Sequence, residues 1–194
     1  MKRSGSAVLV VLLASCLPLF SQHVEIGAFA QYDQQSMPEF AGHLFGLGGR
    51  ADFNTAKTLQ LELELSYDFA HPSFQLSQSA AAAVLTDNRL RVLHANAGLK
   101  LQTPDGSFFL FLKGGANKYG QESNVQTVFG VPPFTITTLS VPERTFTKGI
   151  LYPGGGVGFH AGILGIRLDA GDEIFWSNGA QHNLRVTFGP TIRF

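Results

Sequence analysis

The side chains of this chain that could do chemistry include six histidines, one cysteine and a pair of closely spaced glutamates. No spacing among the histidines, or between a histidine and Cys16, resembles the spacing of a metal site. His94 and His160 fall within segments of alternating polarity, so we expect them to be hydrogen-bonded structural residues. The sequence therefore predicts no metal and no other cofactor.

Two further features could belong to an enzyme. Glu62 and Glu64 are two residues apart, so in a strand they would project from one face, as the carboxylates of a glycosidase might. Nothing in the sequence indicates a cleft of substrate size, and we interpret both as members of an ion-pair network. The glycine-rich segment GGGVG at 154–158 does not join a strand to a helix, so it is not a phosphate-binding loop.

The segments that contain these residues alternate between apolar and polar side chains, with a period of two residues. In TLQLELELSYDF, residues 58–69, one face carries Leu59, Leu61, Leu63, Leu65, Tyr67 and Phe69. The other face carries Gln60, Glu62, Glu64, Ser66 and Asp68. Helical spacing would scatter both sets around the axis, so this is a predicted strand. The same period predicts strands at 24–33, 43–53, 91–101, 107–119, 149–161, 165–176 and 183–194, with a bulge at Pro153.

The connections between these eight segments alternate in length. Tight turns are expected at NTAK, at QTPDG and at 162–165. Longer loops are expected at 34–42, 70–88 and 120–146, the last of them mobile, with a shorter loop at 177–181. An even number of strands with short turns at one end and long loops at the other is typical of a bacterial outer-membrane barrel.

The composition agrees with one all-β domain. The chain has 194 residues, zero formal net charge and only 14% charged residues, so we expect no nucleic-acid partner. Glycine (22) and phenylalanine (17) are abundant, which suits close strand contacts and large apolar anchors. A single cysteine excludes an internal disulfide framework.

The first residues are typical of an export signal. Lys2 and Arg3 precede the apolar run AVLVVLLA, which is too short to span a membrane as a helix. We expect residues 1–21 to be a signal peptide and residues 22–194 to form the barrel domain. LASC at 13–16 also resembles a lipobox, in which cleavage before Cys16 would leave that residue lipidated.

The apolar face of the strands could point outward into lipid or inward around a ligand, as in a soluble lipocalin-like barrel. Three observations favour the outward arrangement: glycines on the polar face, aromatic residues near strand ends on the apolar face, and balanced charges on the polar face. The polar face would then fill a narrow lumen with ion pairs. Hairpin register predicts that Arg50 lies opposite Glu62, and Glu173 opposite Arg185.

The chain resembles the small eight-stranded outer-membrane β-barrels of the OmpA transmembrane-domain or OmpX type. The most specific element of this resemblance is TFGPTIRF at 187–194, which follows that family's C-terminal assembly signal. The resemblance implies that the barrel-assembly machinery recognises Ile192 and Phe194, with Thr187 and Gly189 at the other fixed positions. Pro190 departs from it by removing one ladder donor.

The resemblance implies an integral protein of the cell outer membrane, in contact with membrane lipid and lipopolysaccharide. We expect a non-enzymatic, side-chain-filled barrel, whose role is structural or lies in surface interactions of the long loops with an unidentified ligand. The alternative is a barrel that modifies lipid A, because some such barrels are lipid A deacylases with a Ser-Asn pair near the catalytic histidine. Here Ser177-Asn178 is followed by His182, whereas Phe175 and Trp176 stand where that histidine is expected.

Overall fold

The computed structural model describes residues 24–37, 40–78, 82–129, 136–176 and 179–194. They form strands β1 (Val24–Met37), β2 (Phe40–Asn54), β3 (Leu59–Gln78), β4 (Ala82–Gln102), β5 (Phe108–Phe129), β6 (Ile136–Ala161), β7 (Leu164–Trp176) and β8 (Ala180–Arg193). No helix in these ranges is long and apolar enough to cross a membrane. The predicted signal peptide and the lipobox lie outside the described residues.

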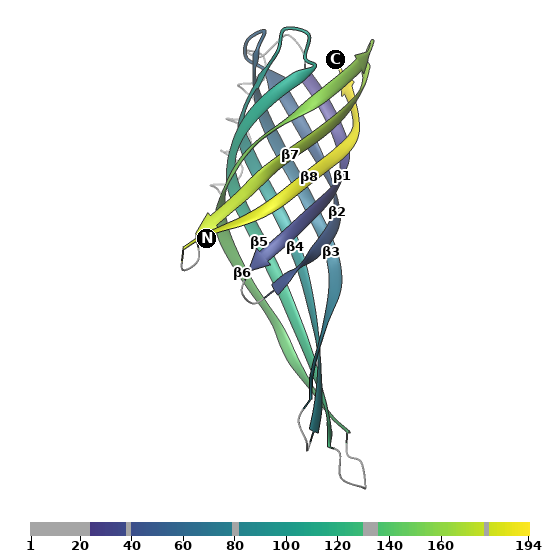
Figure 1. Cartoon of the computed structure of the whole chain (residues 1–194). Coiled ribbons are helices and arrows are strands. Elements are labelled where there is room, and N and C mark those ends of the chain that lie inside the picture. Colours follow the sequence, from purple (N-terminus) through teal and green to yellow (C-terminus); the bar gives the residue numbers. More distant parts are fainter. Residues whose placement is uncertain (1–23, 38–39, 79–81, 130–135, 177–178) are drawn as a thin grey trace, which may run out of the picture.

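The eight strands close into an antiparallel barrel in which each strand pairs with its neighbour in sequence and β8 returns to β1 (Figure 1). Closure is completed at the last residue, where the Phe194 amide donates a hydrogen bond of 2.9 Å to the Val24 carbonyl. The predicted all-β, up-and-down eight-stranded barrel is therefore confirmed. We call the end that holds the short turns and the C-terminus the turn end, and the opposite end the hairpin end.

The strands point their apolar side chains outward and their polar side chains inward. Leu110 and Phe159 are both 69% exposed, whereas Glu62 and Asp68 are fully buried. The burial of β7 alternates along the strand, as the period-two pattern requires. The soluble lipocalin-like alternative was wrong, because it needs the apolar face to line the interior.

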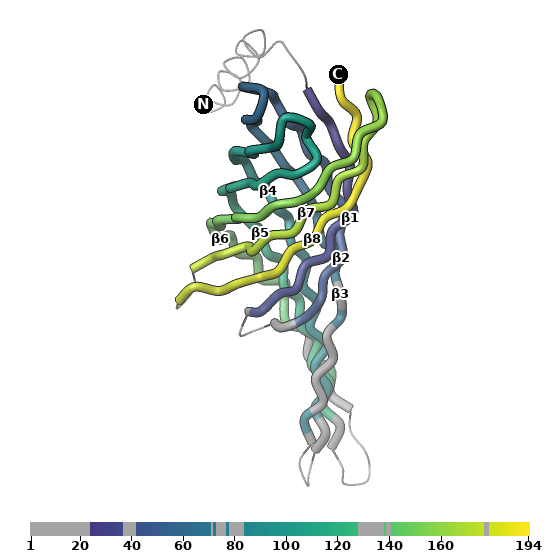
Figure 2. The backbone as a smooth tube through the Cα atoms, turned by 45° about the horizontal axis from the view of Figure 1, so that its top comes forward, coloured from purple at the N-terminus to yellow at the C-terminus, as the bar shows by residue number. Residues whose placement is uncertain are grey.

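The hairpin end differs from the sequence prediction. Strands β3, β4, β5 and β6 run for 20, 21, 22 and 26 residues, whereas β1, β2, β7 and β8 have only 13–15. Most of the predicted loops at 34–42, 70–88 and 120–146 are continuations of strands. Beyond the barrel wall that Figure 2 shows as a tube, β3–β6 form a four-stranded sheet that narrows as its strands twist about one another (Figure 1). We call this segment, residues 71–78, 82–90, 120–129 and 136–147, the hairpin sheet.

The register shifts where this sheet leaves the barrel. One shift lies between Asp68 and His71 on β3, and another between Gln121 and Ser123 on β5. Such irregularities bend a strand and increase its twist, which accounts for the sheet diverging from the barrel wall here. The ladder to β7 skips Tyr152 and Pro153, but the register is the same on both sides of the gap, and Pro153 lies opposite Leu112 on β5. The predicted bulge at that proline was therefore wrong.

The turn end is compact, as predicted. The turn before Ser107 contains Gly106 at φ +74°, and the turn between β6 and β7 contains Gly162 at φ +67°. This left-handed backbone strongly favours glycine. On β8, the ladder to β1 skips Pro190, which is consistent with the expected loss of one donor.

Candidate functional site

The barrel interior gathers most of the chemically capable side chains. Its buried carboxylates are Glu25, Asp33, Asp52, Glu62, Glu64, Asp68, Asp169 and Glu173, and its buried permanent cations are Arg50, Lys100, Lys113, Arg167 and Arg185. Strand alternation places all of them inward, because each occupies the polar phase of its strand. Within the described residues, the fully buried carboxylates thus outnumber the fully buried permanent cations.

Arg167 on β7 organises the half of the lumen nearer the turn end. Its guanidinium contacts Asp52 and Glu62, each at 2.9 Å, and Asp169 at 2.7 Å. Arg50 pairs with the same Asp169 and donates a 2.8 Å hydrogen bond to the hydroxyl of Thr187. These side chains come from β2, β3, β7 and β8, so the network ties strands across the barrel.

A second network lies nearer the hairpin end. Lys113 contacts Glu62 at 2.6 Å and Glu64 at 2.8 Å. Arg185 contacts the other oxygen of Glu64 at 2.7 Å and lies 3.6 Å from Glu173. Some of these cations also lie over buried aromatic rings. The ammonium nitrogen of Lys113, for example, is 4.3 Å from the centroid of the Phe111 ring.

The predicted ion-pair residues all lie in this lumen, but their predicted registers were wrong. Asp52 lies opposite Glu62, and Arg50 opposite Glu64, so Arg50 pairs with Asp169 instead of Glu62. On the last hairpin, Asn183 lies opposite Glu173. Arg185 and Glu173 still meet diagonally at 3.6 Å because both side chains are long. Both errors come from turn length, which sets hairpin register.

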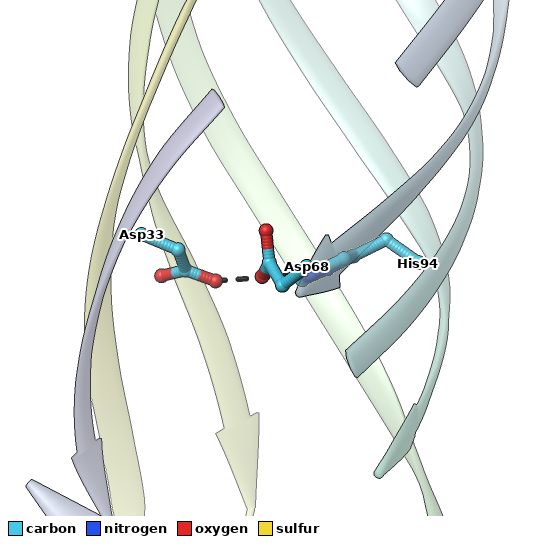
Figure 3. Close-up of side chains that lie close together, drawn as sticks. All are labelled: Asp33, Asp68 and His94. Carbon is cyan, nitrogen blue, oxygen red and sulfur yellow. Dashed lines mark hydrogen bonds and ion pairs between the residues drawn. The ribbon is translucent and has the colours of Figure 1, made fainter. Parts of the chain in front are cut away.

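The third group of lumen side chains was not predicted as a unit. Asp33 from β1 faces Asp68 from β3 and His94 from β4 (Figure 3). His94 Nε2 lies 2.9 Å from Asp68 Oδ2 and 3.8 Å from Asp33 Oδ2, and its Nδ1 lies 3.3 Å from Glu173 Oε2. The residues are separated widely along the chain, so no sequence spacing could have revealed them.

Apolar side chains follow this group toward the hairpin end. The next inward residues along β4, β5 and β7 are Val92, Tyr119 and Phe175, and all three are fully buried. Tyr119 and Phe175 have ring centroids 6.4 Å apart, and Tyr119 stacks on Phe146 at 5.0 Å. We call Val92, Tyr119, Phe146 and Phe175 the lumen cap.

The residues of the predicted assembly signal occupy both faces of β8. Ile192 and Phe194 are exposed on the outer face, whereas Thr187 is buried in the lumen. A β-carbon on Gly189 would lie 1.9 Å from the carbonyl oxygen of Ala28 on β1. Gly189 therefore allows the closing strands to approach, apart from any part in recognition.

The structure describes only some of the residues on which the deacylase hypothesis rests. Ser177 and Asn178 lie outside the described residues. His182 is exposed on the outer face, where its Nδ1 lies 2.6 Å from Asp172 Oδ2. A histidine oriented by a carboxylate is two thirds of a hydrolytic triad.

Closure, outward apolar residues and a charged interior define the class of this protein as a transmembrane eight-stranded β-barrel. Several solved structures have a similar fold. It is similar to Ail, the attachment invasion locus protein of Yersinia pestis, with 12% identity and a TM-score of 0.53 over 89% of this chain and 97% of that one. It is also similar to Neisserial surface protein A, with 12% identity and a TM-score of 0.48 over 90% and 100%.

A third similar structure is the N-terminal β-barrel domain of Pseudomonas aeruginosa OprF, with 10% identity and a TM-score of 0.47 over 89% of this chain and 97% of that one. The likeness to Ail confirms the fold and, at the level of the fold, the predicted resemblance to small outer-membrane barrels. No family model matches the chain. No curated protein matches it either.

Proposed function

We propose that the protein is a non-enzymatic, non-conducting barrel of the bacterial outer membrane that displays the hairpin sheet at the cell surface. The extended strands β3–β6 carry this proposal. Residues 71–78 of β3 alone rise about 25 Å beyond the last pairing with β2, at roughly 3.3 Å per residue. A barrel that only anchored itself in lipid would need none of this length, so we assign the sheet to contacts with partners.

The edges of the hairpin sheet support such a role. Among the described residues, β3 has no partner in β2 beyond Asp68, and β6 has none in β7 before Ile150. Unpaired strand edges offer backbone donors and acceptors to another extended segment. An unidentified surface ligand would contact this sheet, in place of the flexible loops expected from the sequence.

Cysteine labelling tests this orientation. The only native cysteine is Cys16, within the predicted signal peptide. Ser77 lies in the hairpin sheet and Thr58 in a turn at the other end, and both are exposed. A membrane-impermeant maleimide should label Ser77→Cys on intact cells, and Thr58→Cys only after the outer membrane is permeabilised. The reverse pattern, or equal labelling of both, would contradict the proposal.

The lumen supports the non-conducting part of the proposal. Buried ion pairs cross it, and the lumen cap follows them toward the hairpin end. Eight strands enclose only enough space for side chains. Purified protein in a planar lipid bilayer should show no stepwise conductance, and a stable open channel would refute this part.

The outer surface of the barrel indicates which membrane components the protein would contact. The outward apolar residues would contact membrane lipid. Arg91 and Lys118 lie at the hairpin-end rim of this apolar surface, where they could meet the phosphates of lipopolysaccharide.

The barrel-assembly machinery would recognise Ile192 and Phe194. Deleting Phe194 should lower assembly in cells and leave refolding of the purified chain in detergent nearly unchanged. Loss of both would instead indicate a purely structural role for Phe194.

A second candidate is a lipid A-modifying enzyme, favoured by the His182–Asp172 pair on the outer surface. Mass spectrometry of lipid A from cells expressing the wild type, Ser177→Ala or His182→Ala would decide it. Loss of acyl chains that depends on both residues would establish the enzyme. Unchanged lipid A with the wild type would exclude this reaction.

A further inference from the structure

We propose that Asp33, Asp68 and His94 form a structural site for one divalent transition-metal ion, Zn²⁺ in the first instance, inside the barrel. Each offers one ligand atom, and these atoms lie within 4.8 Å of one another. All three side chains are fully buried, so the group is unlike the solvated acidic clusters common on protein surfaces.

The separations fit a zinc coordination sphere. Zinc binds carboxylate oxygen and imidazole nitrogen at about 2.0–2.2 Å, so neighbouring ligands of a tetrahedral ion lie about 3.3 Å apart. His94 Nε2 lies 2.9 Å from Asp68 Oδ2 and 3.8 Å from Asp33 Oδ2, on either side of that value. An ion between them needs only small side-chain adjustments.

The surroundings of the three ligands also match a metal site. The second ring nitrogen of His94 lies 3.3 Å from Glu173 Oε2, and neither atom has a hydrogen-bond partner among the described residues. A small rotation of the ring on metal binding would let this carboxylate accept the N–H, which fixes the tautomer of a ligating histidine and increases the basicity of the nitrogen that binds the metal. Gln31 donates to Asp68 Oδ1, the oxygen that the ion would not need.

Asp33 supplies a separate indication. Its Oδ1 is buried and has no hydrogen-bond partner among the described residues. A buried carboxylate oxygen without a partner is costly, and a cation bound to Asp33 would compensate the charge of this carboxylate.

The charge of this region also calls for a cation. Asp33, Asp68 and Glu173 surround His94, and among the described residues the only permanent cation in an ion pair with any of the three carboxylates is Arg185, which contacts Glu173. Arg185 makes shorter contacts with Glu64 and Ser66, at 2.7 and 2.8 Å, than with Glu173, at 3.6 Å. The negative charge of three carboxylates is therefore balanced by only part of the positive charge of one guanidinium. A divalent ion would compensate the remaining negative charge.

The burial of the site predicts when it fills. The lumen cap lies on the hairpin side and the ion-pair networks on the other, so the ion would enter before the barrel closes. Metal binding would then be coupled to folding, because the ligands from β1, β3 and β4 come together only in the barrel.

The test is metal content after refolding. The full chain is extracted from membranes, unfolded in urea with EDTA, and refolded into detergent with excess Zn²⁺, and free metal is then removed. Mass spectrometry of the metal should give about one zinc per wild-type chain and at least tenfold less for His94→Gln and Asp33→Asn. Asp33→Asn is the second variant in case His94→Gln fails to fold, and a heat-dependent gel shift verifies folding.

His160→Gln is the matched control. His160 is also a lumen histidine, 3.4 Å from Glu25 and 3.1 Å from Arg193, but it is not part of the group. This variant should keep its zinc. Replacing zinc with Co²⁺ should give the visible absorption of a tetrahedral ion in the wild type alone. A metal-free wild type, or zinc retained by the folded His94 and Asp33 variants, would overturn the proposal.

Discussion

Arg167 shows at the scale of one residue how the lumen is stabilised. Its guanidinium compensates three buried carboxylates, Asp52, Glu62 and Asp169. Replacing it with methionine keeps much of the volume and leaves those charges short of partners. We expect Arg167→Met to lower the free energy of unfolding by about 3–5 kcal/mol, measured by urea titration in lipid vesicles.

The control for this change is Arg89→Met. Arg89 makes an ion pair with Asp87 on the exposed hairpin sheet. Exposed pairs contribute at most about 1 kcal/mol, so this variant should unfold near the wild-type urea concentration. Equal losses for both variants would mean that the lumen network does not stabilise the barrel.

Gly98 shows why small residues line the polar face. A β-carbon there would lie 2.1 Å from the carbonyl oxygen of Leu112 on the neighbouring strand, whereas one on outward Gly114 would meet only Ile150 O, at 3.8 Å. Gly98→Ala should destabilise the barrel by about 2 kcal/mol or more, and Gly114→Ala should have little effect. Comparable unfolding midpoints for the two variants would refute this account.

The sequence was sufficient to assign single residues to faces but not to neighbours. Period-two alternation placed Arg185 and Glu173 inward because each side chain follows its own strand. Contacts between strands depend on register, and a shift of two residues keeps every face and changes every partner. For this reason Arg50 was placed on the right face and given the wrong partner, and the group around His94 was missed.

At the scale of elements, the hairpin sheet was the main surprise. Its residues 84–89 are all partly or fully exposed, so neither face of this stretch is buried and the sequence shows no regular alternation. The threonine-rich stretches suit strands nonetheless. Alternation reveals a strand only where its two faces meet different surroundings.

The hairpin sheet lies beyond the barrel wall, so we expect that it can be shortened without loss of the barrel. Ser73 pairs with Asn88, and Ser123 with Val141, so replacing 73–88 and 123–141 with short turns preserves the register below. The shortened protein should still show a heat-dependent gel shift, because the ion-pair networks and the lumen cap remain. A variant that never forms the compact band would show that the sheet is needed for barrel folding.

The turn at 103–107 gives a pH-dependent prediction. Hydrogen bonds from the Thr103 and Ser107 side chains lower the pKa of Asp105 to about 2 from 3.8. A lowered folded-state pKa stabilises the protein above the unfolded-state value, and this stabilisation is lost as the pH falls through about 2. Asp105→Asn should therefore unfold at lower urea than the wild type at pH 7, and at the same urea near pH 2. A difference independent of pH would contradict the assignment.

At the scale of the whole molecule, closure of the barrel explains both how the backbone can lie in lipid and how the interior can hold charges. Pairing of β1 with β8 removes the last free edges of the barrel wall, and this allows polar backbone to lie within lipid. Closure also explains why the interior can hold so many charges, since the wall shields all of them from lipid and most of them are paired within the lumen. The arrangement was predictable from the number and alternation of strands, whereas the hairpin sheet and the lumen partners required coordinates.

The most direct test of the central claim is gel migration of the detergent-extracted outer-membrane fraction, with and without boiling. A closed barrel embedded in that membrane should migrate as a compact band when unheated and shift once boiling unfolds it. If the protein instead appears in the periplasmic extract without detergent, with no heat-dependent shift, the account of an outer-membrane barrel with a charged interior is wrong.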